Sequence, residues 1–182
     1  MTWLFPLLTL PVSLSVVASQ HVADAALSRA CYVLRFLLAD RVSLRHAFYT
    51  SQSRIVVMAH NEKIRDIPEY DFLPEIFDDA VRVLAGTPSV PVTVVGEENL
   101  LCFSNDSNRP EDTLVRELAI SILMTAVPVT MPKLGRMVAA QYTRAMASDL
   151  WQGTYASASP ELYLVSTTFY SRPTKHLELQ NS

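Results

Sequence analysis

The sequence predicts an α+β fold in a single domain, mostly helical with a small sheet. Apolar residues recur at spacings of three and four in several long segments, as on one face of a helix. Two short runs rich in β-branched residues are bounded by turn formers, which is typical of strands. A chain of 182 residues, 49% hydrophobic and 18% charged, can bury the core of one domain, so disorder from a lack of apolar residues is excluded.

The first nineteen residues, MTWLFPLLTLPVSLSVVAS, carry no charged side chain and end in small residues. This pattern predicts a secretory signal peptide over residues 1–19, cut near Ala18 or Ser19, although no Lys or Arg precedes the apolar run. The alternatives are a buried N-terminal segment and a membrane anchor. Pro6 and Pro11, and an apolar run shorter than the roughly 20 residues of a spanning helix, argue against the anchor. We therefore expect no membrane span in the mature chain.

The first half of the remaining chain predicts the order helix, strand, helix, strand. Residues 22–40 have apolar residues at helical spacing with charged residues between them. The runs RIVVMA (54–59) and VPVTVVG (90–96) predict two strands. Between them, residues 74–84 predict a helix that is ended by Gly86.

The second half predicts a loop followed by helices. Residues 97–112 are polar and rich in turn formers, which predicts a loop. Pro110, and the acidic residues after it, favour a helix that begins near Glu111 and runs to about Ala126. A further helix is expected from Pro132 to Trp151, and a last short helix from Ser159.

The expected organisation is a signal peptide over 1–19, one domain over 20–171 and a polar tail over 172–182. A formal net charge of -3 gives no general attraction to phosphate backbones, so nucleic acid is excluded as an expected partner.

Two features agree with export. Asn105 opens an N-x-S acceptor triplet for N-glycosylation within a polar, turn-rich stretch. Cys31 and Cys102 are the only cysteines, and in an exported chain they can form one disulfide. Two buried free thiols are the alternative.

Within the helix expected over 111–126, the five residues Arg116 to Ile120 read R-E-L-A-I. A zinc-protease helix carries H-E-x-x-H, in which two His at i and i+4 bind the metal and the Glu is the general base. Here the Glu and the spacing are present, but both His are missing. The two outer positions still project to the same helix face.

A family resemblance is carried by this segment and three others, which read RIVVMAHNEKIRDIPEY, GTPSVPVTVVGEENLLC and WQGTYASASPELYLVS. Together they resemble secreted zinc metallopeptidases, or zincins, whose catalytic domain is like that of anthrax lethal factor. The resemblance covers most of residues 22–166 and implies a zincin-like fold. In such proteins a Glu seven residues after a conserved Tyr is the third zinc ligand.

Laid on this chain, the resemblance puts Arg116, Ile120 and Leu162 at the three zinc-ligand positions. Arg is positively charged at any working pH, and Ile and Leu have no lone pair to donate. The expected site therefore holds no metal, and no cofactor is expected.

Glu117 and Tyr155 match the general base and the Tyr of the family, so both are vestigial catalytic residues by this resemblance. In the family a further Glu lies four residues after the third zinc ligand, and this position falls on Ser166. Without a metal, Glu117 has no water to activate, and an ion pair with Arg116 is the expected alternative.

The sequence thus predicts a secreted, catalytically inactive metallopeptidase-like protein that binds a peptide or an extracellular protein. One alternative is an extracellular structural or matrix protein. The other is an active peptidase with a metal site rebuilt around His60 or Glu97. The four His have no mutual i, i+4 spacing and are expected to be exposed, and Glu97 and Glu98 are expected to be a solvated pair in a turn.

Overall fold

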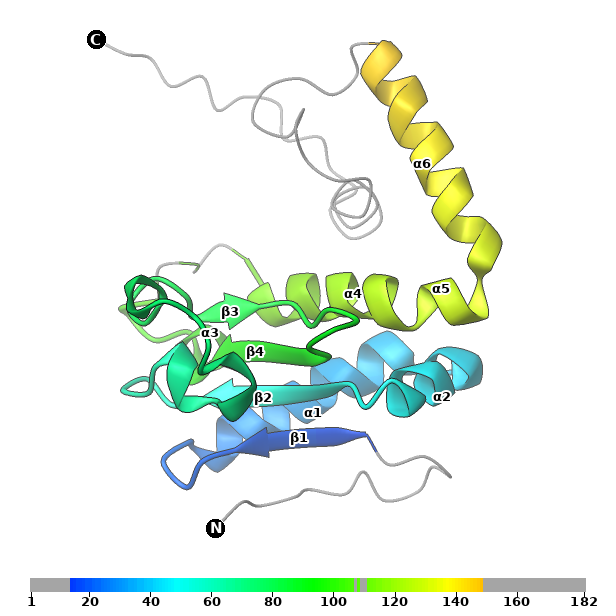
Figure 1. Ribbon diagram of the computed structural model, residues 1–182. Coiled ribbons are helices and arrows are strands. Elements are labelled where there is room, and N and C mark those ends of the chain that lie inside the picture. Colours follow the sequence, from blue (N-terminus) through cyan, green and yellow to red (C-terminus); the bar gives the residue numbers. More distant parts are fainter. Residues whose placement is uncertain (1–13, 107, 109–110, 149–182) are drawn as a thin grey trace, which may run out of the picture. The chain divides into compact units, whose positions relative to one another are not determined.

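The computed structural model describes residues 14–106, 108 and 111–148 (Figure 1). The chain divides into two compact units, residues 1–136 and 137–182, and each is described by itself. The second unit is described only as far as residue 148, within and just after a helix. Three positions that the resemblance singles out therefore lie outside the described residues: Tyr155, Leu162 and Ser166. The expected helix from Ser159 and the polar tail also lie outside them.

The sheet of the first unit has four strands in the order β1-β2-β4-β3. The three strands β1, β2 and β4 are parallel, and β3 runs antiparallel to β4 at the edge. The carboxyl ends of the three parallel strands therefore meet at one edge of the sheet, where ligand sites of open α/β sheets commonly lie. The strands are β1 (Ser15–Ala18), β2 (Arg54–Met58), β3 (Val83–Leu84) and β4 (Val92–Gly96).

More of the described residues lie in helices than in strands. Three-residue 3₁₀ turns occupy Ile64–Asp66, Pro68–Tyr70 and Glu75–Phe77. The α-helices are α1 (Asp24–Leu38), α2 (Val42–Thr50), α3 (Glu97–Leu101), α4 (Thr113–Thr125), α5 (Val127–Thr130) and α6 (Pro132–Ala147).

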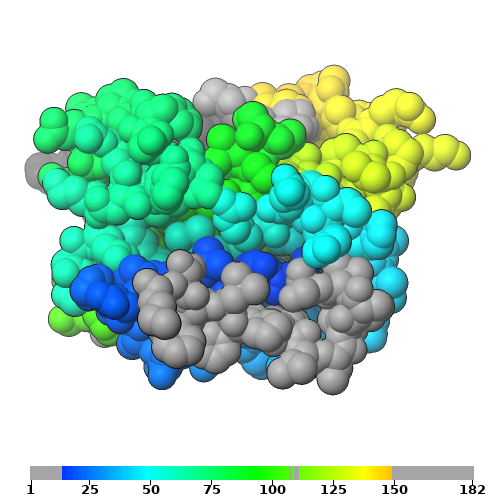
Figure 2. Space-filling view, turned by 60° about the horizontal axis from the view of Figure 1, so that its bottom comes forward, coloured from blue at the N-terminus to red at the C-terminus, as the bar shows by residue number. Residues whose placement is uncertain are grey.

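Apolar side chains cover both faces of the sheet. Successive residues of a strand point to opposite faces, so Ile55 and Val57 pack with α1, α2 and α4, whereas Val56 and Met58 pack with the 3₁₀ turns. Tyr70 closes the second layer, where its hydroxyl donates to the carbonyl of Val92 at 2.6 Å. The space-filling view shows the segment around residues 60–80 as one continuous area of surface, and this segment contains exposed Ile76 (Figure 2).

The predicted α+β class, mostly helical with a small sheet, is confirmed. The predicted strands at 54–59 and 90–96 and the helices at 22–40 and 111–126 are present, with ends that differ by a few residues. The helix predicted from Pro132 is present as α6, which ends at Ala147.

The helix predicted over 74–84 is wrong. Residues 75–77 form one 3₁₀ turn, and Val83 and Leu84 form strand β3, which pairs with Val95 and Val94. Pairing with β4 overrides the local helical pattern because the backbone groups of β3 then have partners along the sheet. Three further α-helices were not predicted: α2, α5 and, within the expected loop over 97–112, α3.

Strand β1 lies inside the segment predicted to be a signal peptide. Leu14 is 3% exposed and Val16 is fully buried, and both belong to the main core. The burial of residues 14, 16 and 18 agrees with the buried-segment alternative for this part of the segment, and residues 1–13 lie outside the described residues.

Candidate functional site

Within the R-E-L-A-I segment of helix α4, Leu118 and Ala119 are buried, whereas the other three residues lie on a partly exposed face. The side chain of Asp112 caps the helix and accepts a hydrogen bond from the backbone N–H of Val115 at 3.2 Å. Leu114, Leu118 and Ile122 are buried and hold the opposite face of α4 in the core. Arg116, Glu117 and Ile120 are each partly exposed.

The guanidinium of Arg116 is bound by two carboxylates. Its Nε donates to Glu117 Oε1 at 2.8 Å, and its Nη1 pairs with Glu111. The carboxylate at the general-base position is therefore engaged by its neighbouring cation. The expected ion pair between Arg116 and Glu117 is present.

The two described residues at the zinc positions that the resemblance implies, Arg116 and Ile120, do not fit a zinc ion. Arg116 places a paired positive charge at the first position, and the side chain of Ile120 at the second has no donor atom. Within the described ranges, no three His, Cys, Asp or Glu side chains are grouped so that they could hold a metal ion. No catalytic step that depends on zinc can be derived from these residues.

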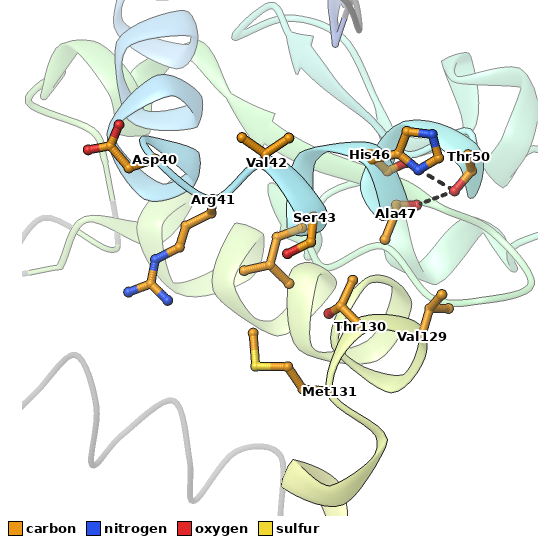
Figure 3. Close-up of a pocket in the computed structure, with 11 residues that line it drawn as sticks. Asp40, Arg41, Val42, Ser43, His46, Ala47, Thr50, Val129, Thr130 and Met131 are labelled. Atoms are coloured by element: carbon orange, nitrogen blue, oxygen red, sulfur yellow. Dashed lines mark hydrogen bonds between the residues drawn. The ribbon is translucent and has the colours of Figure 1, made fainter.

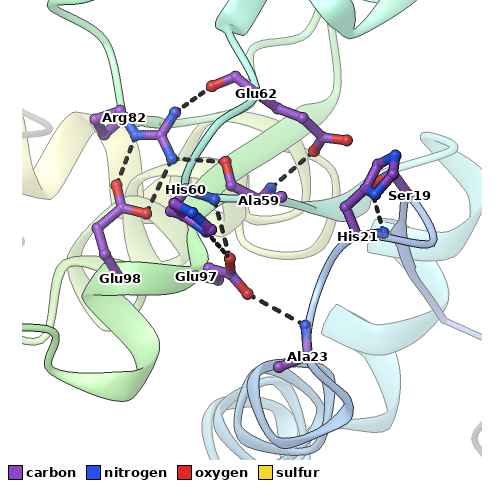
Figure 4. A network of polar contacts seen from close by, with 9 residues as sticks. All are labelled: Ser19, His21, Ala23, Ala59, His60, Glu62, Arg82, Glu97 and Glu98. Atoms are coloured by element: carbon purple, nitrogen blue, oxygen red, sulfur yellow. Dashed lines mark hydrogen bonds and ion pairs between the residues drawn. The ribbon is translucent and has the colours of Figure 1, made fainter.

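A second polar cluster lies at the carboxyl edge of the sheet (Figure 4). Glu97 follows β4 directly, and its side chain is only 4% exposed. Its carboxylate accepts hydrogen bonds from the backbone N–H of Ala23 at 3.2 Å, and from the backbone N–H and Nδ1 of His60 at 3.0 and 2.8 Å. One carboxylate thus joins the start of α1, the end of β2 and the end of β4.

The hydrogen bonds determine the charge of Glu97. Burial acts to raise the pKa of this carboxyl group. The hydrogen bonds from the side chain and backbone of His60 and from the backbone of Ala23 lower the pKa by more than burial raises it. The net result is a pKa below the ordinary value of 4.5. Glu97 is therefore ionised at neutral pH.

Glu98 forms a separate ion pair with Arg82. Arg82 Nε and Nη2 donate to the two carboxylate oxygens at 2.6 and 2.9 Å, a bidentate arrangement. Arg82 also donates to the carbonyls of Ala59 and Glu62. Gly96 lies against this carboxylate, because a Cβ at that position would clash with Glu98 Oε1.

The expectation that Glu97 and Glu98 are solvated is wrong. Both are buried, at 3% and 5% exposure, because each carboxylate has partners from distant segments. His60 is 58% exposed, and His21 and His46 are also exposed, as expected, whereas His176 lies outside the described residues.

The other predicted site residues are separate from these clusters. Asn105 is exposed, and Ser107 of its triplet lies outside the described residues. Cys31 and Cys102 are both free, so the predicted disulfide is not formed in the structure. Burial raises the pKa of the Cys31 thiol, and the nearby charge of Arg35 acts in the opposite direction.

An open groove of about 870 Å³ lies between α2 and α5 (Figure 3). Arg41, Val42, His46 and Thr50 line it from the α2 side, and Val129 lines it from α5. None of the residues predicted from the sequence to form a site lines this groove. Its walls hold no buried charged side chain that would recognise a particular ligand.

Comparison of the chain with family models, curated proteins and solved structures gives no match. In the described part of the chain, no helix combines the length and the apolar character that crossing a bilayer requires.

Proposed function

We propose that the chain is a metallopeptidase-like protein without zinc chemistry that binds a peptide or an extracellular protein. The observation that carries this proposal is the pairing of Arg116 with Glu117 and Glu111 on the partly exposed face of α4. A general base must be free to accept a proton from a metal-bound water. Here the carboxylate faces a permanent cation in the place of a metal ligand.

The surface beside α4 supports a binding role. Helix α4 packs against β3 and β4, and β3 is the edge strand of the sheet. An edge strand offers backbone hydrogen-bonding groups to which an extended peptide can add. Ile120 adds a partly exposed apolar side chain and Arg116 a charged one to the neighbouring helix face. An extended peptide with an apolar side chain suits this surface.

The first test is metal content and cleavage. We expect the purified protein to contain much less than one zinc per chain by elemental mass spectrometry and to leave a peptide library intact. Glu117→Gln is expected to change neither result, because this carboxylate has no catalytic role. One zinc per chain, with cleavage that both a chelator and Glu117→Gln abolish, would contradict the loss of chemistry.

The second test is peptide binding. We expect Ile120→Gln to weaken the binding of peptides selected from a display library by roughly tenfold, which corresponds to the loss of one apolar contact. Phe36→Gln is the control, since Phe36 is a 67% exposed apolar residue on another helix. The control variant should bind as the unsubstituted protein does. Circular dichroism checks that the unsubstituted protein and both variants are folded. Equal peptide binding by the three folded proteins would refute the assignment of the binding site to this surface.

A further inference from the structure

Strand β1 is part of the main core. Its register places Val16 beside Ile55 and Ala18 beside Val57 of β2. Val16 is fully buried and Ala18 is 8% exposed, and both pack in the cluster that contains residues of α1, α2 and α4. The strand therefore supplies both backbone pairing and apolar contacts.

The segment that follows β1 is fixed as well. Val22 is 7% exposed and belongs to the same cluster. The next backbone N–H, that of Ala23, donates to the buried carboxylate of Glu97. The residues before and after the connection from β1 to α1 are thus both held in place, β1 and Val22 by the core and Ala23 by Glu97.

A cut near Ala18 or Ser19 would remove this strand. Strand β2 would lose its parallel neighbour and become an edge strand. The core would lose the side chains of Leu14, Val16 and Ala18. Signal peptides are removed from the mature protein, so the truncated product would have to fold with an open sheet edge and an incomplete core.

We infer that Leu14–Ala18 is retained in the folded protein, so that the processing site of any leader lies before Leu14. This inference does not depend on the proposed binding function. It assigns the apolar residues at the end of the uncharged segment to the sheet and limits an export signal to residues 1–13.

The alternation of β1 provides a matched pair of variants. Val16 is buried, whereas Val17 is partly exposed on the opposite side of the strand. Val16→Thr and Val17→Thr change the hydropathy of the apolar run equally, so any effect on export is shared. Only the first puts a hydroxyl into the main core.

The experiment measures the intact mass and the thermal melting of the full chain and of both variants after purification. We expect every chain to include Leu14–Ala18, and Val16→Thr to lower Tm by roughly 3–10 °C, with Val17→Thr within about 2 °C of the unsubstituted protein. Val16→Ala replaces Val16→Thr if that variant does not accumulate, and a fall in Tm is expected again. A folded product that begins at Ser19 or Gln20, with equal melting of all variants, would overturn the inference.

Discussion

Arg82→Ala is expected to lower the free energy of unfolding by about 3–5 kcal/mol, the range for removing one partner of a buried ion pair. Glu98 is 5% exposed, and its carboxylate accepts hydrogen bonds from Nε and Nη2 of Arg82. Without Arg82 this charge stays buried and unpaired. The carbonyls of Ala59 and Glu62 also lose a donor.

The measurement is urea unfolding at pH 7, followed by circular dichroism. Arg29→Ala is the matched control, because the ion pair of Arg29 with Asp112, at 2.9 Å, is 45% and 40% exposed. Exposed pairs contribute about 0–1 kcal/mol, so this variant should remain close to the unsubstituted protein. The double variant Arg82→Met with Glu98→Met should be more stable than Arg82→Ala, because no unpaired charge remains. Equal losses of unfolding free energy for Arg82→Ala and Arg29→Ala would show that the buried ion pair stabilises the fold no more than the exposed one does.

The sequence predicts those elements whose signal is local. The run RIVVMA is β-branched and bounded by turn formers, and the helix from about 111 has Asp112 as its cap and a buried apolar face. Strand β3 has only two residues and exists because β4, which follows later in the chain, pairs with it. A pattern within one segment does not contain that information.

The N-terminal strand was not predicted for a different reason. A buried strand and the apolar part of a signal peptide are both short, uncharged runs, so composition alone does not separate them. What separates them is the parallel pairing of Val16 and its neighbours with β2, more than thirty residues later in the sequence. Only the structure shows that pairing.

The two polar clusters differ in how far apart their partners lie in the sequence. Arg116 and Glu117 lie in one short segment, and the sequence predicts their ion pair. Glu97 is bonded to Ala23 and His60, which are 74 and 37 residues away. The one local sign of its burial is that it directly follows the fully buried strand β4, at the edge where the carboxyl ends of parallel strands meet.

Glu97→Ala is expected to lower the free energy of unfolding by about 2–4 kcal/mol at pH 7, because buried N–H groups would lose their acceptor. The backbone N–H groups of Ala23 and His60 are the two affected donors, and the start of α1 loses its tie to β2 and β4. Glu97→Gln keeps an oxygen acceptor of the same shape. We therefore expect it to cost less than the alanine variant, about 1–2 kcal/mol.

The pH dependence distinguishes the charge of Glu97 from its shape. Because the folded pKa is below the ordinary value of 4.5, ionised Glu97 stabilises the folded state above that value, and this stability is lost as the pH falls through the folded pKa. The difference in unfolding free energy between the unsubstituted protein and Glu97→Gln should therefore shrink as the pH falls below the ordinary value of 4.5. Urea unfolding across this pH range measures the difference. A difference in unfolding free energy that stayed constant with pH would contradict this expectation. It would mean that an oxygen acceptor of this shape is sufficient and that the negative charge of Glu97 does not stabilise the junction of α1, β2 and β4.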